Sequence, residues 1–345
     1  QPGDLDLPFS HVQKSARRGV CLGYVGGVAS TGTGDGEGQG VTAGGRTGRV
    51  SWFDSLSSGL RRAVSSTVDG ESAMPLGMGS RLGPYTLEQK IGQGGMGAVY
   101  RARHARLPRP VAVKLMRTRV AGAQSTALFE MEVRQTSRLT HPSTVSIFDV
   151  GTAPDGVLYY VMEYIEGITL EDLVVAHGPV PSGRVVHVLA QVAHALAEAH
   201  ELGLVHRDIK PSNILLCDRG GVCDLPKLVD FGLVADLRAP IDPSDGHASP
   251  LLGTPMYMAP EALCETHRVD ARTDIYALGA VAYYMLTGTE LFELVPNVNE
   301  LIRLQIERLP QRPATRLGER VPPDLERIIM RCLAKSPSER PVTAL

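Results

Sequence analysis

One short stretch of charged and polar side chains has the composition of a reactive loop. His206-Arg207-Asp208-Ile209-Lys210-Pro211-Ser212-Asn213 places an Asp, a Lys and an Asn within six residues. The Asp carboxylate can accept a proton, the Lys ammonium can neutralise a phosphate, and the Asn amide oxygen can bind a hard metal ion. Such a loop needs other elements to bring a phosphate donor and an acceptor hydroxyl to it.

A glycine-rich segment lies between strand-like segments upstream of this loop. Residues 85–91 alternate as a half-buried strand does, and Gly92-Gln93-Gly94-Gly95-Met96-Gly97 follows with a G-x-G-x-x-G spacing. In a dinucleotide-binding domain these glycines open a helix. Here residues 98–103 and 111–116 read as further strands, which predicts an antiparallel flap. Its loop can lay backbone N–H groups over phosphates, where a side chain would block the approach.

The following segments complete a small sheet and then become helical. Residues 125–139 read as a helix that contains Glu132, and residues 145–150 and 157–162 as two more strands, so we expect five strands and one helix. Beyond a connector at residues 163–167, apolar residues recur at helical spacing in three segments, at residues 185–197, 274–286 and 325–333. The sequence predicts an α+β fold with a sheet lobe and a larger helical lobe. The polar stretch 217–227 is expected to bulge as a loop.

Several motifs in a fixed order now support a family resemblance. Besides the glycine loop and H-R-D-I-K-P-S-N, the chain has V-A-V-K ending at Lys114, Asp230-Phe231-Gly232 and Ala259-Pro260-Glu261. Together they closely resemble the Hanks-type protein kinases, especially the bacterial serine/threonine branch, over residues 85–345. The resemblance implies the bilobal kinase fold, with a small lobe at about 85–162, a connector at 163–167 and a large lobe at 168–345. The last helix is expected to be truncated at Leu345.

The resemblance also implies roles for the charged residues. Asp208 would be the catalytic base, and Lys210 would neutralise the γ-phosphate and favour Ser/Thr over Tyr substrates. Lys114, paired with Glu132, would grip the α- and β-phosphates of ATP. Mg²⁺, with Mn²⁺ as an alternative ion, would be bound by Asn213 and Asp230.

By the same resemblance, ATP would lie between the glycine loop and an apolar pocket. Met162 stands at the gatekeeper position, and the connector backbone from Glu163 to Ile165 would bond the adenine. Taken singly, each apolar residue is as well explained by the core. The residues expected to contact ATP are Ile91, Gly92, Gln93, Gly94, Gly95, Met96, Gly97, Val99, Ala112, Lys114, Met162, Glu163, Ile165 and Leu215.

The segment 230–261 resembles the family's activation segment. We hypothesise that autophosphorylation on Ser244 or Ser249 orders it through Arg207. Thr254 is expected to bond Asp208 and Lys210 instead. Two further positions have supporting roles by resemblance: Asp274 would fix the catalytic-loop backbone, and Arg340 would pair with Glu261.

The N-terminal segment differs in composition from the rest. Residues 1–81 are rich in glycine and small polar residues, which predicts a flexible tail because too little apolar surface is available to offset ordering entropy. Within it, Trp52-Phe53 with Leu56 and Leu60 has helical spacing. Either this island is a transient amphipathic turn, or it is a docking helix for a partner or the folded domain.

The overall composition narrows the class of protein. The formal net charge of -2 gives no indication of nucleic acid as a partner. Five scattered cysteines without C-x-x-C spacing argue against a disulfide scaffold or a structural zinc site and favour a cytoplasmic location. No segment approaches the roughly 18 apolar residues of a membrane helix.

The expected function is phosphoryl transfer from ATP to Ser/Thr hydroxyls of proteins, including the chain itself, in bacterial signalling. Two alternatives remain at this point. A pseudokinase would bind nucleotide or partners without transfer, although such proteins usually lack one of Lys114, Asp208, Asn213 or Asp230, all present here. A small-molecule kinase would lack the peptide-binding surface that the complete activation segment implies.

Overall fold

A computed structural model describes residues 76–94, 97–119, 123–231, 255–264, 269–292, 295 and 297–345. The chain divides into two compact units, Gln1–Ala63 and Val64–Leu345, and all the described residues belong to the second. The predicted tail therefore falls almost entirely outside the described residues, as does the island at Trp52-Phe53.

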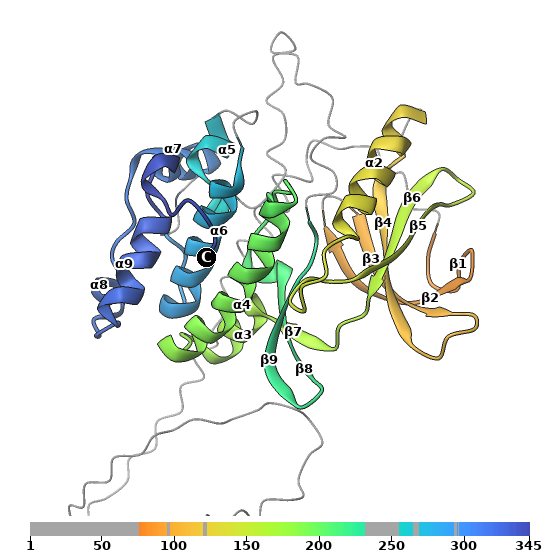
Figure 1. The fold of residues 1–345 in the computed structure, drawn as a ribbon, viewed down its shortest axis with the longest axis horizontal. Coiled ribbons are helices and arrows are strands. Elements are labelled where there is room, and N and C mark those ends of the chain that lie inside the picture. Colours follow the sequence, from red (N-terminus) through yellow and green to blue (C-terminus); the bar gives the residue numbers. More distant parts are fainter. Residues whose placement is uncertain are drawn as a thin grey trace, which may run out of the picture. The chain divides into compact units, whose positions relative to one another are not determined.

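The sheet lobe is a six-stranded antiparallel sheet in the order β1-β2-β3-β4-β6-β5 (Figure 1). Its strands are β1 (Arg81–Leu82), β2 (Tyr85–Gly94), β3 (Gly97–His104), β4 (Pro110–Arg119), β5 (Ile147–Thr152) and β6 (Val157–Glu163). The expected count of five strands was wrong. The additional strand, β1, has only two residues and turns back on β2 through Gly83, whose φ of 54° suits glycine. Ordered backbone thus begins before Tyr85.

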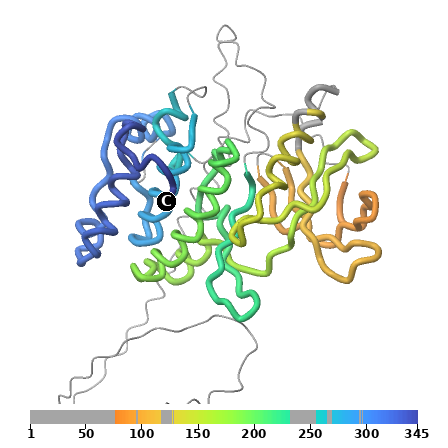
Figure 2. Tube along the Cα trace, in the orientation of Figure 1, coloured from red at the N-terminus to blue at the C-terminus, as the bar shows by residue number. Residues whose placement is uncertain are grey.

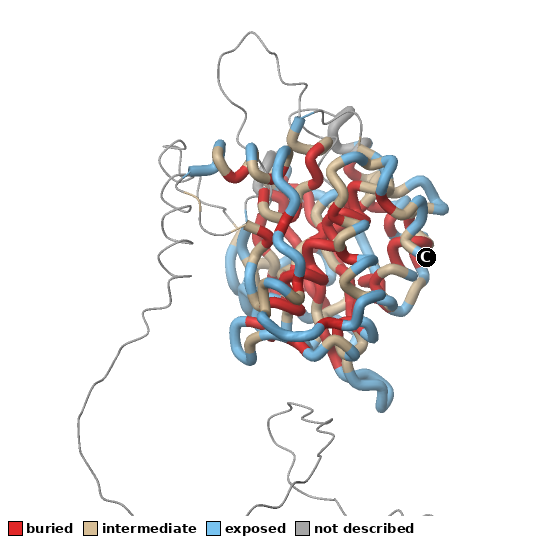
Figure 3. Tube along the Cα trace, turned by 90° about the vertical axis from the view of Figure 1, so that its left-hand side faces the viewer, coloured by how far each residue is buried: buried red, intermediate tan, exposed pale blue. Residues whose placement is uncertain are grey.

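Strand β6 contributes to two separate hydrophobic cores. Its alternation directs Leu158, Tyr160 and Met162 into the larger core, which also contains Phe129 and Val133 of helix α2 (Ala123–Thr136). The intervening residues Val157, Tyr159 and Val161 pack into a second core under β1 to β4. Buried residues lie inside the folded part and exposed residues on its outside (Figure 3). Because the period of a strand is two, neighbouring residues of β6 serve different cores.

The helical lobe, drawn in green to blue in Figures 1 and 2, contains α6 (Ala271–Thr287). Most residues of α6 are buried, so the lobe is built around this helix. Asp270 caps its first turn by accepting from the Arg272 amide, and Gly288 ends it in the left-handed conformation. The other helices are α3 (Leu170–His177), α4 (Ser182–Glu201), α5 (Pro260–Cys264), α7 (Val298–Glu307), α8 (Pro313–Leu317) and α9 (Pro323–Cys332). The α+β fold with a sheet lobe and a helical lobe is confirmed.

The stretch 217–227 corrects another expectation. Instead of a bulging loop, β8 (Ile214–Arg219) and β9 (Val222–Leu228) pair almost throughout and turn at Gly220 and Gly221, both at positive φ. A third short strand, β7 (Gly167–Thr169), pairs with β8. The polar composition that suggested a loop includes Asp224, which forms a bidentate ion pair with Arg184 of α4. Only a register shift between Cys217 and Arg219 resembles the expected bulge.

Close packing of α6 on α9 leads to a stability prediction. A Cβ on Gly279 would lie 2.6 Å from the Cβ of Cys332, so Gly279→Ala should lower the free energy of unfolding by about 1–3 kcal/mol through overpacking. This loss would exceed the gain of up to about 1 kcal/mol in helix propensity. Gly183→Ala in α4, which meets nothing within 4 Å, is the matched control and should be neutral or stabilising. Urea denaturation of both variants measures the difference, and equal stabilities would contradict it.

Candidate active site

The loop after α4 brings Asp208, Lys210 and Asn213 together. The Lys210 ammonium donates to both Asp208 carboxylate oxygens, at 3.0 and 2.8 Å. The Asn213 amide nitrogen donates to the backbone carbonyl and to Oδ2 of Asp208, at 2.8 and 2.9 Å. Asn213 is held in a short 3-10 turn, Pro211–Asn213, so its spacing from Asp208 follows from local backbone structure. Because Nδ2 of Asn213 is engaged with Asp208, Oδ1 is the atom of this side chain that could bind a metal ion.

A buried carboxylate beneath this loop fixes its backbone. Asp274, in the first turn of α6, is 0% exposed and accepts from the amides of His206 at 2.8 Å and Arg207 at 2.9 Å. The His200 ring is 2.9 Å from the same carboxylate. Arg207 has a φ of 65°, a conformation that a non-glycine residue keeps only when its surroundings impose it. The Asp274 contacts supply that constraint.

His206 connects the loop to the start of the Asp230 segment. Its Nε2 lies 3.0 Å from the Val229 carbonyl, which can only accept, while its Nδ1 accepts from the Asp208 amide at 3.3 Å. Burial lowers the pKa of His206, against the opposing charges of nearby Asp residues, so the ring is neutral with its proton on Nε2. The ring also packs on Phe231, with centroids 4.4 Å apart. His206 thus aligns two segments without being charged.

Asp230 joins the helical lobe to the sheet. Its Oδ1 lies 2.8 Å from the Lys114 ammonium and accepts from the Tyr160 hydroxyl at 3.1 Å. Burial alone would raise the pKa of Asp230, but the charge and hydrogen bond of Lys114, with the Tyr160 hydroxyl, hold it below its ordinary value. Burial, followed by the Asp230 carboxylate, raises the pKa of Tyr160 well above its ordinary value. An ionised Asp230 therefore faces one cation and one neutral donor.

Lys114 lies within the sheet with only 7% of its surface exposed. In the structure, Lys114 forms an ion pair with Asp230. Glu132 lies half-buried on α2. The expected pairing of Lys114 with Glu132 remains a prediction.

The donor set suits a hard cation bound mainly by phosphates. Among the described residues, no three His, Cys, Asp or Glu side chains gather as a self-sufficient metal site. Mg²⁺ usually binds proteins through one or two carboxylates together with substrate phosphates. One ionised, half-buried carboxylate at Asp230 and the Oδ1 of Asn213 therefore fit Mg²⁺.

The described glycines of the loop serve different purposes. Gly92 and Gly94 close β2, and a Cβ on Gly94 would meet nothing within 4 Å, so that position is open on its outer side. A Cβ on Gly97, by contrast, would overlap the Leu115 carbonyl oxygen of the neighbouring strand. Gly97 is therefore required by strand packing. Gln93 lies on β2 between Gly92 and Gly94, whereas Gly95 and Met96 lie outside the described residues.

The expected adenine pocket is partly assembled from paired strands. Ala112 and Met162 are direct cross-strand partners on β4 and β6, and both are buried. Val99 on β3 and Leu215 on β8 are half-buried, and Ile91 on β2 is 43% exposed.

At the connector, the backbone amide of Glu163 is already hydrogen-bonded within the protein and is not available to a nucleotide. The Glu163 amide donates to the Ser146 carbonyl at 2.9 Å, so it is already engaged in the sheet. Its carboxylate is bound by Lys227 and Arg219, which overcome the effect of burial and lower the pKa of Glu163. The expected adenine contacts therefore fall to the Glu163 carbonyl and to Ile165.

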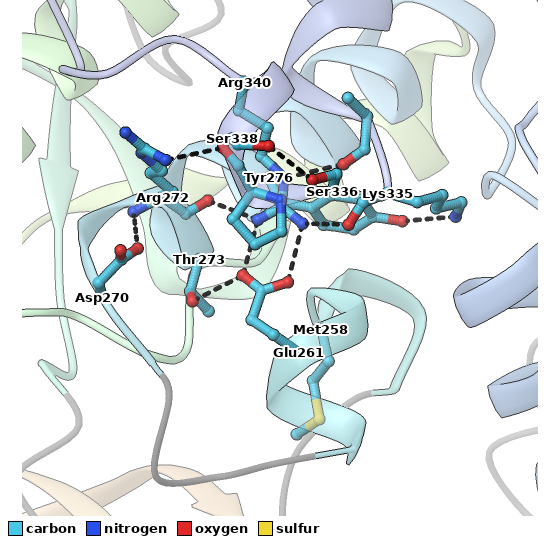
Figure 4. A network of polar contacts seen from close by, with 12 residues as sticks. Met258, Glu261, Asp270, Arg272, Thr273, Tyr276, Lys335, Ser336, Ser338 and Arg340 are labelled. Carbon is cyan, nitrogen blue, oxygen red and sulfur yellow. Dashed lines mark hydrogen bonds and ion pairs between the residues drawn. The ribbon is translucent and has the colours of Figure 1, made fainter.

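Arg340 and Glu261 form a buried bidentate ion pair at 2.7 and 2.8 Å (Figure 4). Arg340 is 1% exposed and also donates to three backbone carbonyls, those of Arg272, Ala334 and Lys335. Its guanidinium stacks on the Tyr276 ring at 4.9 Å. Thr273 donates to the same Glu261 oxygen that Arg340 binds. This network ties α5 to α6 and to the segment after α9.

The regulatory part of the expected site lies mostly outside the described residues. Ser244, Ser249 and Thr254 fall within residues 232–254, which the structure does not describe. Arg207 is described and is exposed on the loop that carries Asp208. Phosphorylation of either serine stays a prediction.

Sequence patterns did not single out Tyr160. Its hydroxyl reaches Asp230, and its backbone pairs directly with Lys114 across β4 and β6. The signal was present in the alternation of β6, since Met162, expected at the pocket, lies two residues away and therefore on the same face.

A buried acid lies elsewhere in the helical lobe. The Glu290 carboxylate accepts from the Tyr257 hydroxyl at 2.8 Å. Burial, reinforced by the charge of Glu171, raises the pKa of Glu290 to about 7 against the effect of that hydrogen bond.

Comparisons with known proteins agree with the geometry. Residues 85–344 match the protein kinase domain family. The serine/threonine-protein kinase pkn3 of Myxococcus xanthus is 38% identical over 262 residues, covering 75% of this chain and 48% of that protein. The kinase PknB of Mycolicibacterium smegmatis is 38% identical, covering 75% and 41%. The chain thus spans about half or less of these curated relatives.

Solved structures show the same likeness. The Mycobacterium tuberculosis PknI kinase domain superposes with a TM-score of 0.59 at 27% identity, covering 78% of this chain and 95% of that one. Within the described part of the chain, no helix is long and apolar enough to cross a membrane.

Removing the buried guanidinium of Arg340 should strongly destabilise the fold. Arg340→Met should lower the free energy of unfolding by about 3–5 kcal/mol, because it leaves the Glu261 carboxylate buried without its cation. Arg327→Met is the control, since Arg327 is 71% exposed and pairs with an exposed Asp324. It should change stability by less than about 0.5 kcal/mol. Chemical denaturation compares the two, and a mild effect of Arg340→Met would contradict the interpretation.

Glu290 should make stability depend on pH. Since its pKa is raised from 4.5 when unfolded to about 7 when folded, its stabilising contribution is complete below about pH 4.5 and is lost as pH rises through about 7. Glu290→Gln should remove this loss. Between pH 5 and 8 the free energy of unfolding of the wild type should therefore fall relative to that of the variant, by on the order of 2 kcal/mol. Urea unfolding at several pH values measures this, with Glu307→Gln, an exposed carboxylate on α7, as control. Parallel curves for wild type and Glu290→Gln would refute it.

Proposed function

Because this chain belongs to the protein kinase family, in the bacterial Hanks-type serine/threonine branch, we propose that it transfers the γ-phosphate of ATP to Ser/Thr hydroxyls of proteins. The observation that carries the proposal is the convergence of Asp208, Lys210 and Asn213 on one loop. The ion pair between Lys114 on β4 and Asp230, which follows β9, supports it. Protein substrates, including the chain itself, belong to this proposal.

Asp208 is the proposed base for the substrate hydroxyl. Its Oδ1 and Oδ2 both accept hydrogen bonds from the Lys210 ammonium, so Lys210 holds the carboxylate in one orientation. A phosphate oxygen arriving beside this pair would also meet the Lys210 ammonium. Lys210 can therefore neutralise the transferring group while Asp208 accepts the proton.

The remaining charges would position the nucleotide. Lys114 would bind the α- and β-phosphates, and Asn213 Oδ1 with the Asp230 carboxylate would hold Mg²⁺ or Mn²⁺. The ion supplies charge neutralisation across the phosphates. Ala112 and Met162, buried side by side, would cover one face of the adenine.

The alternatives differ in what they need from these residues. A pseudokinase needs no base, whereas Asp208 here is held by both Lys210 and Asn213. A small-molecule kinase needs no peptide-binding segment, whereas Gln305 of α7 donates to the Met256 and Met258 carbonyls and so supports the backbone before α5. Both observations favour transfer to proteins. A cytoplasmic location, which the cysteine distribution suggested, stays a prediction.

Replacing the proposed base tests the function. Asp208→Asn should reduce phosphoryl transfer to a generic protein substrate by roughly 10²–10⁴-fold, the usual contribution of a positioned base. Transfer of radiolabelled phosphate from ATP measures the rate. Asp324→Asn, which changes a carboxylate 92% exposed on α9, should leave the rate unchanged. An Asp208→Asn enzyme as fast as the wild type would exclude Asp208 as the base, and an inactive wild type would favour the pseudokinase.

A further inference from the structure

Tyr160 occupies an unusual place for a hydroxyl. It is 2% exposed, lies in the larger hydrophobic core, and its ring is 6.4 Å from that of Phe129. A buried hydroxyl without a partner is costly, so its one hydrogen bond, to Asp230 Oδ1, largely determines its orientation. Since an ionised carboxylate only accepts, the Tyr160 hydroxyl donates.

The two donors to Asp230 come from neighbouring strands in direct register. Lys114 on β4 and Tyr160 on β6 are cross-strand partners, and the Lys114 ammonium lies 5.9 Å from the centroid of the Tyr160 ring. Both donate to the same atom, Oδ1 of Asp230, at 2.8 and 3.1 Å. They therefore both act on Oδ1, and neither of these two contacts engages Oδ2.

The two donors constrain Asp230 differently. An ammonium is a compact charge on a flexible stem with three rotatable donors, so it attracts the carboxylate without fixing its plane. The Tyr160 hydroxyl is carried by a rigid ring locked in a packed core, which gives it one direction. Asp230 has a φ of 59°, which is uncommon for a non-glycine residue. Its backbone therefore needs contacts from its surroundings to keep this conformation.

We propose that Tyr160 is a positioning residue that orients the Asp230 carboxylate so that Oδ2 is presented to the nucleotide-bound metal ion. The inference rests on the proposed function, because it assigns Asp230 to that ion. In this role Tyr160 acts through Asp230, the group to which its hydroxyl donates. Its removal should therefore weaken the metal-dependent part of nucleotide binding and leave the metal-independent part.

The test is a pair of single-atom deletions on adjacent residues. Tyr160→Phe removes the hydroxyl and keeps the ring in the core. Tyr159→Phe is the matched control, because Tyr159 is also buried, at 8% exposed, but packs into the other core beside Gly151. For each protein, calorimetry measures the affinity for a non-hydrolysable ATP analogue with Mg²⁺ and with chelator. Thermal unfolding without nucleotide reports on the fold.

In the wild type, Mg²⁺ should increase the affinity for the analogue. In Tyr160→Phe this increase should fall by about tenfold, the lower range for a hydrogen bond to a charged group, while the affinity in chelator stays within about twofold. Tyr159→Phe should match the wild type in both measurements. The kcat for phosphoryl transfer in Tyr160→Phe should fall by a similar factor.

Two results would overturn the proposal. If Tyr160→Phe keeps the full Mg²⁺ effect, its hydroxyl does not orient Asp230. If it loses affinity equally with Mg²⁺ and with chelator, the role of Tyr160 is general to the pocket. Neither result concerns transfer itself, which the Asp208→Asn comparison measures separately, so failure of the inference and failure of the proposed function can be told apart.

Discussion

The buried carboxylate of Asp274 is the constraint on which the proposed site depends. Removing a carboxylate from water costs several kcal/mol unless its oxygens are satisfied, and here two backbone amides and the His200 ring satisfy them. Its place in the first turn of α6 adds the favourable end of the helix dipole. In exchange, the backbone at Arg207 is held at a positive φ that a non-glycine residue rarely adopts alone. The short spacing from there to Asp208, Lys210 and Asn213 then sets the geometry of the loop.

Asp230 extends this fixed geometry to the sheet. Its backbone follows Val229, which is tied to His206, and its side chain is tied to β4 and β6. Other polar contacts also join the two lobes: Glu163 of β6 is bound by Lys227 and Arg219, and Glu198 of α4 accepts from the amides of Thr140 and His141. Asp230 is therefore one of several polar links between the lobes.

Motif order was enough to predict the fold and to locate the expected catalytic residues, because they are close in sequence or carried by elements with clear periodicity. It could not reveal Tyr160, whose contact with Asp230 depends on the register between β4 and β6. The hairpin of β8 and β9 was misjudged because Asp224 looks like a loop residue, although Arg184, 40 residues earlier, pairs with it. Strand β1 was missed because a strand of two residues is too short to show an alternation of apolar and polar side chains. For Tyr160 and for Asp224, the missing information was a partner distant in sequence.

The ion pair of Arg340 with Glu261 has a consequence for biosynthesis. The two residues are separated by 79 positions, and Arg340 stands near the end of the described chain. During synthesis from the N-terminus, Glu261 emerges long before its cation exists. Until then the Glu261 carboxylate of α5 has no guanidinium to pair with, and burying it would be costly. Stable packing of α5 against α6 therefore depends on a segment that is synthesised much later.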